Sequence, residues 1–166
     1  MTNPGNSSRT KIKRLPEKAQ TDVEALYSVL DSGLVAHVGV IDHGQPIVIP
    51  VGYARDRDTL LIHGSSASRL FTLLASGVPA CVTVTRLDGL VLARSLFESS
   101  MNYRCAMVFG TATRLSGQAE VDALKVVTEH LMPGRWDDAR QPTTKELKAT
   151  MTLSLPLDEC SVKISE

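Results

Sequence analysis

Residues 60–74 read LLIHGSSASRLFTLL, and the fold has to be built around this stretch. It begins as a short apolar strand, turns at the polar run HGSS, and continues with apolar side chains at helical spacing. Ser68 lies where the helix would begin, and serine is a favoured N-cap residue. The hydroxyl groups, the unpaired N–H groups of a helix start and the guanidinium of Arg69 also suit a phosphate or carboxylate. These residues alone leave both interpretations open.

Composition excludes several classes of protein. The 166 residues fit one domain, and 18 basic against 18 acidic side chains give no excess positive charge for nucleic acid. No apolar run approaches the roughly 20 residues of a membrane span. The three cysteines, Cys81, Cys105 and Cys160, are odd in number and widely spaced, which is typical neither of a disulfide framework nor of a zinc site. We therefore predict a cytoplasmic protein with no metal, membrane or nucleic-acid partner.

Short turns separate β-branched runs on both sides of the opening stretch. We predict strands at residues 34–41, 46–54, 59–62, 80–85, 90–93, 102–114, 151–155 and 161–164. Helices are predicted from Pro16 to about Leu30, over residues 68–75 and 120–131, and after Thr143, with a turn at residues 86–89. Residues 1–13 are polar and basic and are predicted to be a flexible arm, with residues 14–166 forming one domain.

The order of these elements favours a barrel. The first three strands form an antiparallel meander, and neither GxGxxG nor a P-loop motif is present. About six largely antiparallel strands with peripheral helices predict a mainly β protein, a small six-stranded antiparallel barrel. A barrel of this size is filled by its own side chains, so a cofactor would lie outside it, in a groove between subunits.

Seven blocks of sequence then carry a resemblance that covers nearly the whole chain beyond residue 10. They are RLPEKA at 14–19, GLVAHVGV at 33–40, GQPIVIPVGYARD at 44–56, LLIHGSSASR at 60–69, VTVTRLDGLVLARS at 82–95, SMNYRCAMVFG at 100–110 and PGRWDDARQPTTKELKAT at 133–150. In this order they resemble the pyridoxamine 5'-phosphate oxidase-like family, whose fold is the FMN-binding split barrel. The resemblance is strongest to its flavin-nucleotide-binding branch, which is related to nitroimidazole-resistance proteins.

The resemblance implies a homodimer that binds FMN at the subunit interface. By similarity, the phosphate would be held by His63, Gly64, Ser65, Ser68 and Arg69. The isoalloxazine ring would lie along the second strand, near Val48, Ile49, Pro50 and Val51. Asn102, Tyr103 and Arg104 would approach the flavin from the same subunit or from its partner.

Several of these residues also have ordinary structural interpretations. Pro50 either marks an edge strand, since it lacks an N–H for the ladder, or simply ends a run of strand pairing. Tyr103 could stack on the flavin or pack in a dimer, and Arg104 could be an interface cation. His37 is expected in the core or an interface, and His130 is expected to face solvent.

His63 is the only histidine for which we predict a chemical role. It lies at the junction between strand and helix, and its unperturbed pKa makes it a candidate proton donor beside the flavin. The chain departs from related sequences in the loop before SMNYR, where Phe97-Glu98-Ser99 replaces the histidines that relatives commonly carry. Cys105 also replaces a usual serine.

Three functions remain open at this stage. The first is an FMN-dependent oxidoreductase or reductase acting on a small molecule, with the cofactor supplying the chemistry. The second is a flavin-binding or flavin-sensing module without turnover. The third is a relative of the same barrel that binds haem or a deazaflavin.

Overall fold

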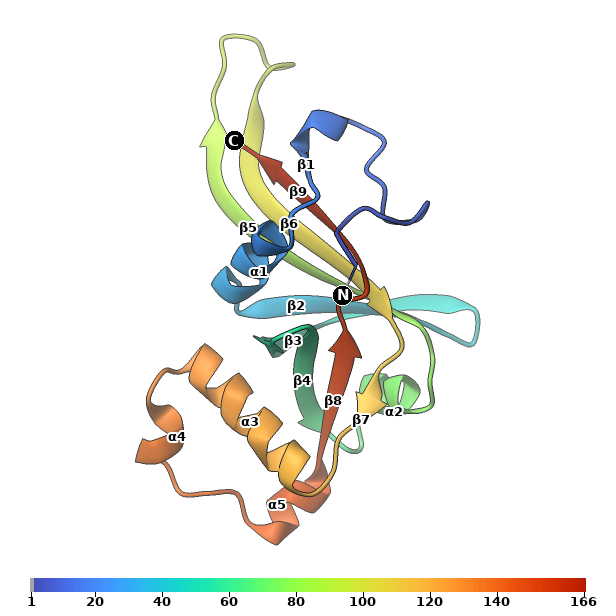
Figure 1. Cartoon of the computed structure of the whole chain (residues 1–166), viewed down its shortest axis with the longest axis vertical. Helices are drawn as coiled ribbons and strands as arrows, with labels where there is room; N and C mark the ends of the chain where they lie inside the picture. Colours follow the sequence, from blue (N-terminus) through green and yellow to red (C-terminus); the bar gives the residue numbers. More distant parts are fainter. Residues whose placement is uncertain (1) are drawn as a thin grey trace.

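A hairpin of two long strands joins the two halves of the sheet in the computed structural model, which describes residues 2–166 (Figure 1). Strand β2 (Val35–Asp42) pairs along its whole length with residues 45–52 of β3 (Gln45–Asp56). The two residues of the turn, His43 and Gly44, have φ angles of 47° and 79°. This left-handed conformation matches the twist of a tight antiparallel hairpin and explains the glycine.

The last four residues of β3 pair with a different strand. Residues 53–56 pair with β4 (Thr59–Ser65), and β4 pairs along its length with β8 (Thr150–Pro156). On the other side of β2 lie β5 (Ala80–Val91), β6 (Ser100–Gly110) and β9 (Glu159–Ser165). Two-residue strands complete the edges, β1 (Ala19–Gln20) beside β9 and β7 (Thr113–Arg114) beside β8.

The protein is mainly β, as predicted, but the structure does not confirm the predicted count of six strands in a barrel. Within residues 2–166 nine antiparallel strands form one sheet in the order β1-β9-β6-β5-β2-β3-β4-β8-β7, and the two ends are not joined. The two-residue strands β1 and β7 carry no periodic pattern of their own, because they form only where β9 and β8 offer a free edge. The sequence could not reveal them.

Two further expectations are corrected. The turn predicted at residues 86–89 does not form, because β5 runs straight through this segment and absorbs it as a bulge between Leu87 and Gly89. The helix predicted from Pro16 begins later. Pro16–Lys18 form only a short 3-10 turn (η1), β1 follows, and α1 (Val23–Ser32) starts after Asp22, whose carboxylate accepts a hydrogen bond from Glu24 N at 3.1 Å.

The helices cover different faces of the sheet. Helix α1 packs Leu26, Val29 and Leu30 into the main core, and α2 (Arg69–Ala75) adds Leu70, Phe71 and Leu74. Helix α3 (Gln118–Leu131) lies on the opposite face of β3 and β4, where a second small core forms from Ala54, Leu61, Ala123 and Val127. The short helices α4 (Arg135–Asp138) and α5 (Thr144–Ala149) lead from α3 back to β8 (Figure 1).

Residues of the predicted N-terminal arm contact the last strand. Gly5 N donates to Cys160 O at 2.8 Å, and Arg9 forms an ion pair with Glu159 and lies over the ring of Phe109. Thr10 is only 2% exposed. In the described part of the chain no helix is long and apolar enough to cross a membrane.

Candidate functional site

Strands β3 and β4 separate at the point where the opening stretch of sequence reaches His63. Residues 45–52 of β3 pair only with β2, while His63, Gly64 and Ser65 of β4 pair only with β8. Within residues 2–166 no strand therefore occupies the side of residues 45–52 that faces away from β2. We call this side the β3 edge.

The β3 edge has an unusual composition. Pro46, Val48 and Pro50 alternate along the strand, so their backbone groups point to the same side. Proline on an edge strand lies with its nitrogen away from the ladder, so this side is the β3 edge. All three residues therefore offer a carbonyl oxygen at the edge, but only Val48 also offers an N–H. Pro50 pairs in register with His37, so it does not end the ladder.

The four residues predicted to lie under the ring divide between two faces. The side chains of Val48 and Pro50 are exposed on the outer surface, and that of Val48 is 63% exposed. Those of Ile49 and Val51 pack against the main core. Only the outer pair presents side chains to a ligand, whereas the inner pair anchors the strand.

His63 lies across the strand separation on β4, half-buried. Burial lowers the pKa of its imidazole below the ordinary value of 6.5, so the ring is neutral at pH 7. Its Nδ1 atom is buried and has no hydrogen-bond partner among residues 2–166. The directly paired residue on β8, Thr152, is fully buried and its hydroxyl likewise has no partner in the described chain. Leaving a buried polar atom unpaired costs about 1–3 kcal/mol, so these two atoms are candidates for contact with a ligand.

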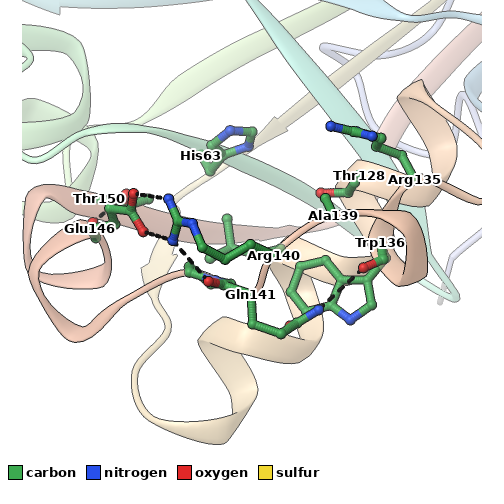
Figure 2. A pocket seen from close by; sticks show the side chains of 11 residues that line it. His63, Thr128, Arg135, Trp136, Ala139, Arg140, Gln141, Glu146 and Thr150 are labelled. Carbon is green, nitrogen blue, oxygen red and sulfur yellow. Dashed lines mark hydrogen bonds and ion pairs between the residues drawn. The ribbon is translucent and has the colours of Figure 1, made fainter.

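A cavity of about 320 Å³ opens in front of His63. Figure 2 shows the His63 ring on one side and Trp136, Arg140 and Gln141 along the other. The remaining lining comes from α3, the connection to α5 and the start of β8: Leu124, Thr128, Arg135, Ala139, Pro142, Glu146 and Thr150. The cavity thus combines an aromatic ring, two arginines and a neutral histidine with an apolar wall.

The wall opposite His63 is held by contacts within its own segment. The carboxylate of Glu129 accepts hydrogen bonds from Gly134 N and Trp136 N, each at 2.7 Å, and these bonds lower the pKa of Glu129. Arg140 forms a two-pronged ion pair with Glu146 at 2.7 and 2.8 Å. Glu146 also completes a capping box with Thr143 at the start of α5, and the pKa of its carboxyl is far below the usual range because of these bonds.

The residues predicted to hold a phosphate lie together between β4 and α2. Ser65 Oγ accepts from Ala67 N at 3.2 Å, while the Ser68 hydroxyl makes no capping hydrogen bond. Arg69 is 65% exposed, and its Nε lies 3.3 Å from a carboxylate oxygen of Asp42. Gly64 has a packing role, because an added Cβ would lie 2.4 Å from the ring of Phe71.

The last three predicted residues lie in another part of the molecule. Asn102, Tyr103 and Arg104 are on β6, which is separated from β4 by β5, β2 and β3 in the sheet. Arg104 Nε donates to Asp88 on the neighbouring strand at 3.0 Å. Figure 1 shows this end of β5 and β6 projecting away from β4 and α2. Within one subunit, these three residues therefore do not lie near His63.

Sequence reasoning missed Trp136, Arg140 and Thr152 as site residues. The block PGRWDDARQPTTKELKAT contains the first two, but nothing in its pattern says that it faces His63. Thr152 is found only through the register of β4 with β8. His130 was expected in solvent, but its Nε2–H donates to Gly33 O at 2.7 Å and its ring lies 5.7 Å from that of Tyr53.

Comparison with known proteins identifies the family. The family model for pyridoxamine 5'-phosphate oxidase matches residues 22–164, and the chain belongs to this family. No curated protein sequence matches the chain.

Two solved structures share both sequence and fold with it. The FAD and heme binding protein of Mycobacterium smegmatis is 43% identical over 90% of this chain and 74% of its own, with a TM-score of 0.87. The flavocytochrome Anf3 of Azotobacter vinelandii is 38% identical over 100% of this chain and 77% of its own, with a TM-score of 0.90. A 5-nitroimidazole antibiotic resistance protein of Bacteroides thetaiotaomicron is 20% identical over 88% of this chain and 86% of its own, with a TM-score of 0.74, and shows the same fold.

Proposed function

We propose that this chain is a flavin-dependent oxidoreductase that binds the FMN moiety of its cofactor along the β3 edge. The observation that carries the proposal is the separation of β3 from β4, which leaves a row of backbone groups without a strand partner beside the buried, unpaired Nδ1 of His63. The polar edge of an isoalloxazine ring is planar and carries donors and acceptors in alternation. An unpaired strand edge also presents hydrogen-bond donors and acceptors in a row. FMN and FAD both contain this moiety.

The donor set fits that group. The Val48 N–H and the carbonyl oxygens of Val48 and Pro50 would meet the polar edge of the ring. Ser65, Ser68 and Arg69 would hold the phosphate, since hydroxyl groups and a guanidinium form strong charge-assisted hydrogen bonds with phosphate oxygens. The Arg69 ion pair with Asp42 uses the Nε side of the guanidinium, and the Arg69 side chain is 65% exposed. Arg69 thus keeps donors for the phosphate.

The chain supplies binding and orientation, and the bound flavin supplies two-electron transfer to or from a small molecule. His63 would act as a neutral imidazole, because burial keeps its pKa below 6.5. A neutral ring both donates and accepts a hydrogen bond. His63 therefore suits the passage of a proton beside the ring more than the stabilisation of a negative charge.

We also propose that the active form is a cytoplasmic homodimer with the cofactor at the interface. Beyond Val84, β5 no longer pairs with β2, and residues 86–104 form a projecting arm, which we call the β5–β6 ribbon. Its tip exposes Leu92 by 88%, Leu96 by 94% and Phe97 by 98%. A second copy would cover these side chains. It would also receive Asn102, Tyr103 and Arg104 beside its own β3 edge.

A proline substitution tests the carrying observation directly. Val48→Pro removes the one N–H of the edge among these three positions without removing a ladder bond, since the backbone groups of residues 46, 48 and 50 all point away from β2. We expect the variant to bind FMN about tenfold more weakly, which corresponds to the loss of about one hydrogen bond. Val48→Ala, which keeps the N–H, is the matched control and should bind within about twofold of the parent. Equal affinity of Val48→Pro and the parent would place the flavin elsewhere.

Turnover is tested on the flavin-loaded protein. An oxidoreductase should lose its flavin absorbance when NADH or NADPH is added without oxygen, and regain it with an electron acceptor such as a quinone or a nitroaromatic compound. Persistent absorbance with both nucleotides, while dithionite still bleaches it, would favour the flavin-binding module without turnover.

Haem binding beside the flavin is a second candidate. The 43% identical relative binds FAD and haem, and this chain exposes His37 on the outer face of β2 directly opposite Pro50. An exposed imidazole on a flat apolar sheet can ligate a haem iron. Addition of hemin should produce a sharp Soret band that His37→Ala lacks, and a band of equal strength in the variant would exclude this ligand.

A further inference from the structure

We propose that the tip of the β5–β6 ribbon of a second copy of this chain docks in a groove on the outer face of the sheet. The tip comprises residues 92–99, which follow the last strand pair of the ribbon, Val91 with Ser100. The inference rests on the homodimer of the proposed function and adds to it the surface that receives the ribbon.

The groove follows one row of residues across four strands. Val48 on β3 pairs with Gly39 on β2, and Gly39 pairs on its other side with Cys81 on β5. Cys81 pairs in turn with Phe109 on β6. Side chains of directly paired residues lie on the same face of a sheet, so the whole row shares the outer face with Val48. A groove of about 320 Å³ lies along this row, and we call it the outer groove.

The backbone does not require the glycine at position 39. Its φ angle lies outside the left-handed region, and an added Cβ would have its nearest neighbour, the Cys81 carbonyl oxygen, at 3.5 Å. This distance is an ordinary contact. Glycine within a strand weakens it and often marks a place where another molecule or another backbone approaches closely. The missing side chain at Gly39 therefore favours a docking site.

The outer groove and the tip of the ribbon are both apolar. Among the lining residues, all of them in the described chain, Arg9 alone is charged. The tip exposes Leu96 by 94% and Phe97 by 98%, and such side chains mark a protein interface. An engineered cavity of about 150 Å³ holds one benzene ring, so the outer groove has room for both side chains.

The length of the ribbon matches the length of the row. The proposed function brings Asn102 of a second copy beside the β3 edge, where the row begins. Phe97 is five residues away along the same chain and can reach about 17 Å from Asn102 at full extension. From β3 to β6 there are three strand spacings, which is about 14 Å. Phe97 of the second copy can therefore reach the end of the row at Phe109.

Opposite charges meet at that end of the outer groove. The Arg9 guanidinium lies over the Phe109 ring, with its Cζ 4.6 Å from the ring centroid. Its Nε and Nη2 donate to Glu159, which leaves the Nη1 group for another acceptor. Glu98 directly follows Phe97, is exposed, and forms no ion pair with any residue of the described chain. A tip that enters the groove with Phe97 thus brings Glu98 to Arg9.

Cys81 allows a direct test, because it lines the outer groove and is only half-buried. In Phe97→Cys, diamide should take one hydrogen from the introduced thiol and one from Cys81 of the second copy, and a disulfide should form between the two chains. We expect a covalent dimer on a non-reducing gel, with the linked peptides identified by mass spectrometry. Adding Cys81→Ser to Phe97→Cys should abolish it. Leu15→Cys, at an exposed leucine outside the ribbon, is the matched control and should form no link with Cys81.

The affinity of the dimer, measured by sedimentation velocity, is an independent test. Gly39→Leu fills the outer groove and should weaken the dimer at least about tenfold, whereas Gly39→Ala should stay within about threefold. Circular dichroism should show both variants folded. Glu98→Gln should weaken the dimer by about two- to fivefold, as the loss of an exposed ion pair does. Arg94→Gln, which removes the other charge of the same tip, should not weaken it.

The possible results separate this inference from the proposed function. A dimer that forms no disulfide through Cys81, or that Gly39→Leu leaves unchanged, would overturn the docking of the tip in the outer groove and leave the homodimer intact. A parent protein that stays monomeric at every concentration would instead reject the homodimer of the proposed function.

Discussion

At two places in this sheet the pairing between neighbouring strands ends, and the surfaces exposed at these places differ. Where β3 leaves β4, the exposed backbone carries two prolines, and buried polar atoms of His63 and Thr152 lie without partners in the described chain. Where β5 leaves β2, β5 and β6 stay paired with each other as far as Val91 and Ser100, and the β5–β6 ribbon exposes leucine and phenylalanine side chains instead.

We propose that the difference separates a ligand site from a protein interface. Unpaired backbone and orphaned polar atoms need hydrogen bonds, which a polar ligand supplies. Large exposed apolar side chains need only to be removed from water, and a second protein surface does this best. The predicted site residues divide in the same way: His63 to Arg69 belong to the first place and Asn102 to Arg104 to the second.

The largest expected effect comes from the ribbon. Leu96→Ser combined with Phe97→Ser removes two large apolar side chains, each worth about 1.5–3 kcal/mol when buried. We expect dimer dissociation to become at least about 100-fold more favourable, as measured by sedimentation velocity over a range of protein concentrations. Leu15→Asn, an exposed leucine outside the ribbon, is the control. A dimer of unchanged stability would assign the ribbon to another partner.

The next effect concerns the phosphate. Arg69→Ala should weaken FMN binding by roughly 10–100-fold, since a hydrogen bond to a charged group is worth about 1.5–3 kcal/mol. Asp42→Asn should instead strengthen FMN binding, because it releases Arg69 from its ion pair. Titration of both variants with FMN measures the contrast. If Arg69→Ala binds like the parent, the phosphate lies elsewhere.

Gly64 is expected to matter for stability more than for binding. Gly64→Ala places a Cβ 2.4 Å from the ring of Phe71, and overpacking of this kind costs about 1–3 kcal/mol. Urea unfolding should show the loss. Gly89→Ala meets no atom within 4 Å and should change stability by less than about 0.5 kcal/mol. Two equal losses would contradict the packing role.

The smallest effect is a dependence on pH. Burial lowers the pKa of His63 in the folded chain, so below pH 6.5 the unfolded chain binds a proton that the folded chain does not. Stability should therefore decrease as the pH falls from 6.5 towards the lowered pKa. Thermal unfolding between pH 7.5 and 5 should show a shallower decrease for His63→Gln than for the parent. Parallel curves would show that His63 is not titrating in this range.

Local pattern was enough for the parts of the fold that local chemistry determines. The hairpin of β2 and β3, the strand ending at the HGSS run and the helix after Ser68 were all predicted close to their observed bounds. For Pro50 the missing N–H left two interpretations open, and the register of β2 with β3 decided for the edge strand. The cavity could not be predicted, because Trp136 faces His63 across it only after α3 has packed on β3 and β4. Thr152 required the register of β8.

The connection from α3 to β8 has a consequence for engineering. Glu129, Arg140 and the capping box at Thr143 tie this segment to itself, and none of the strand pairs of the described sheet involves residues 132–149. We therefore expect that the sequence of this connection can be changed while the strands of the sheet stay in place. Libraries that vary residues 135–139 and 141–142 while keeping Glu129, Arg140 and Glu146 should yield folded proteins with altered ligand preference, which makes this loop a suitable place to begin directed evolution.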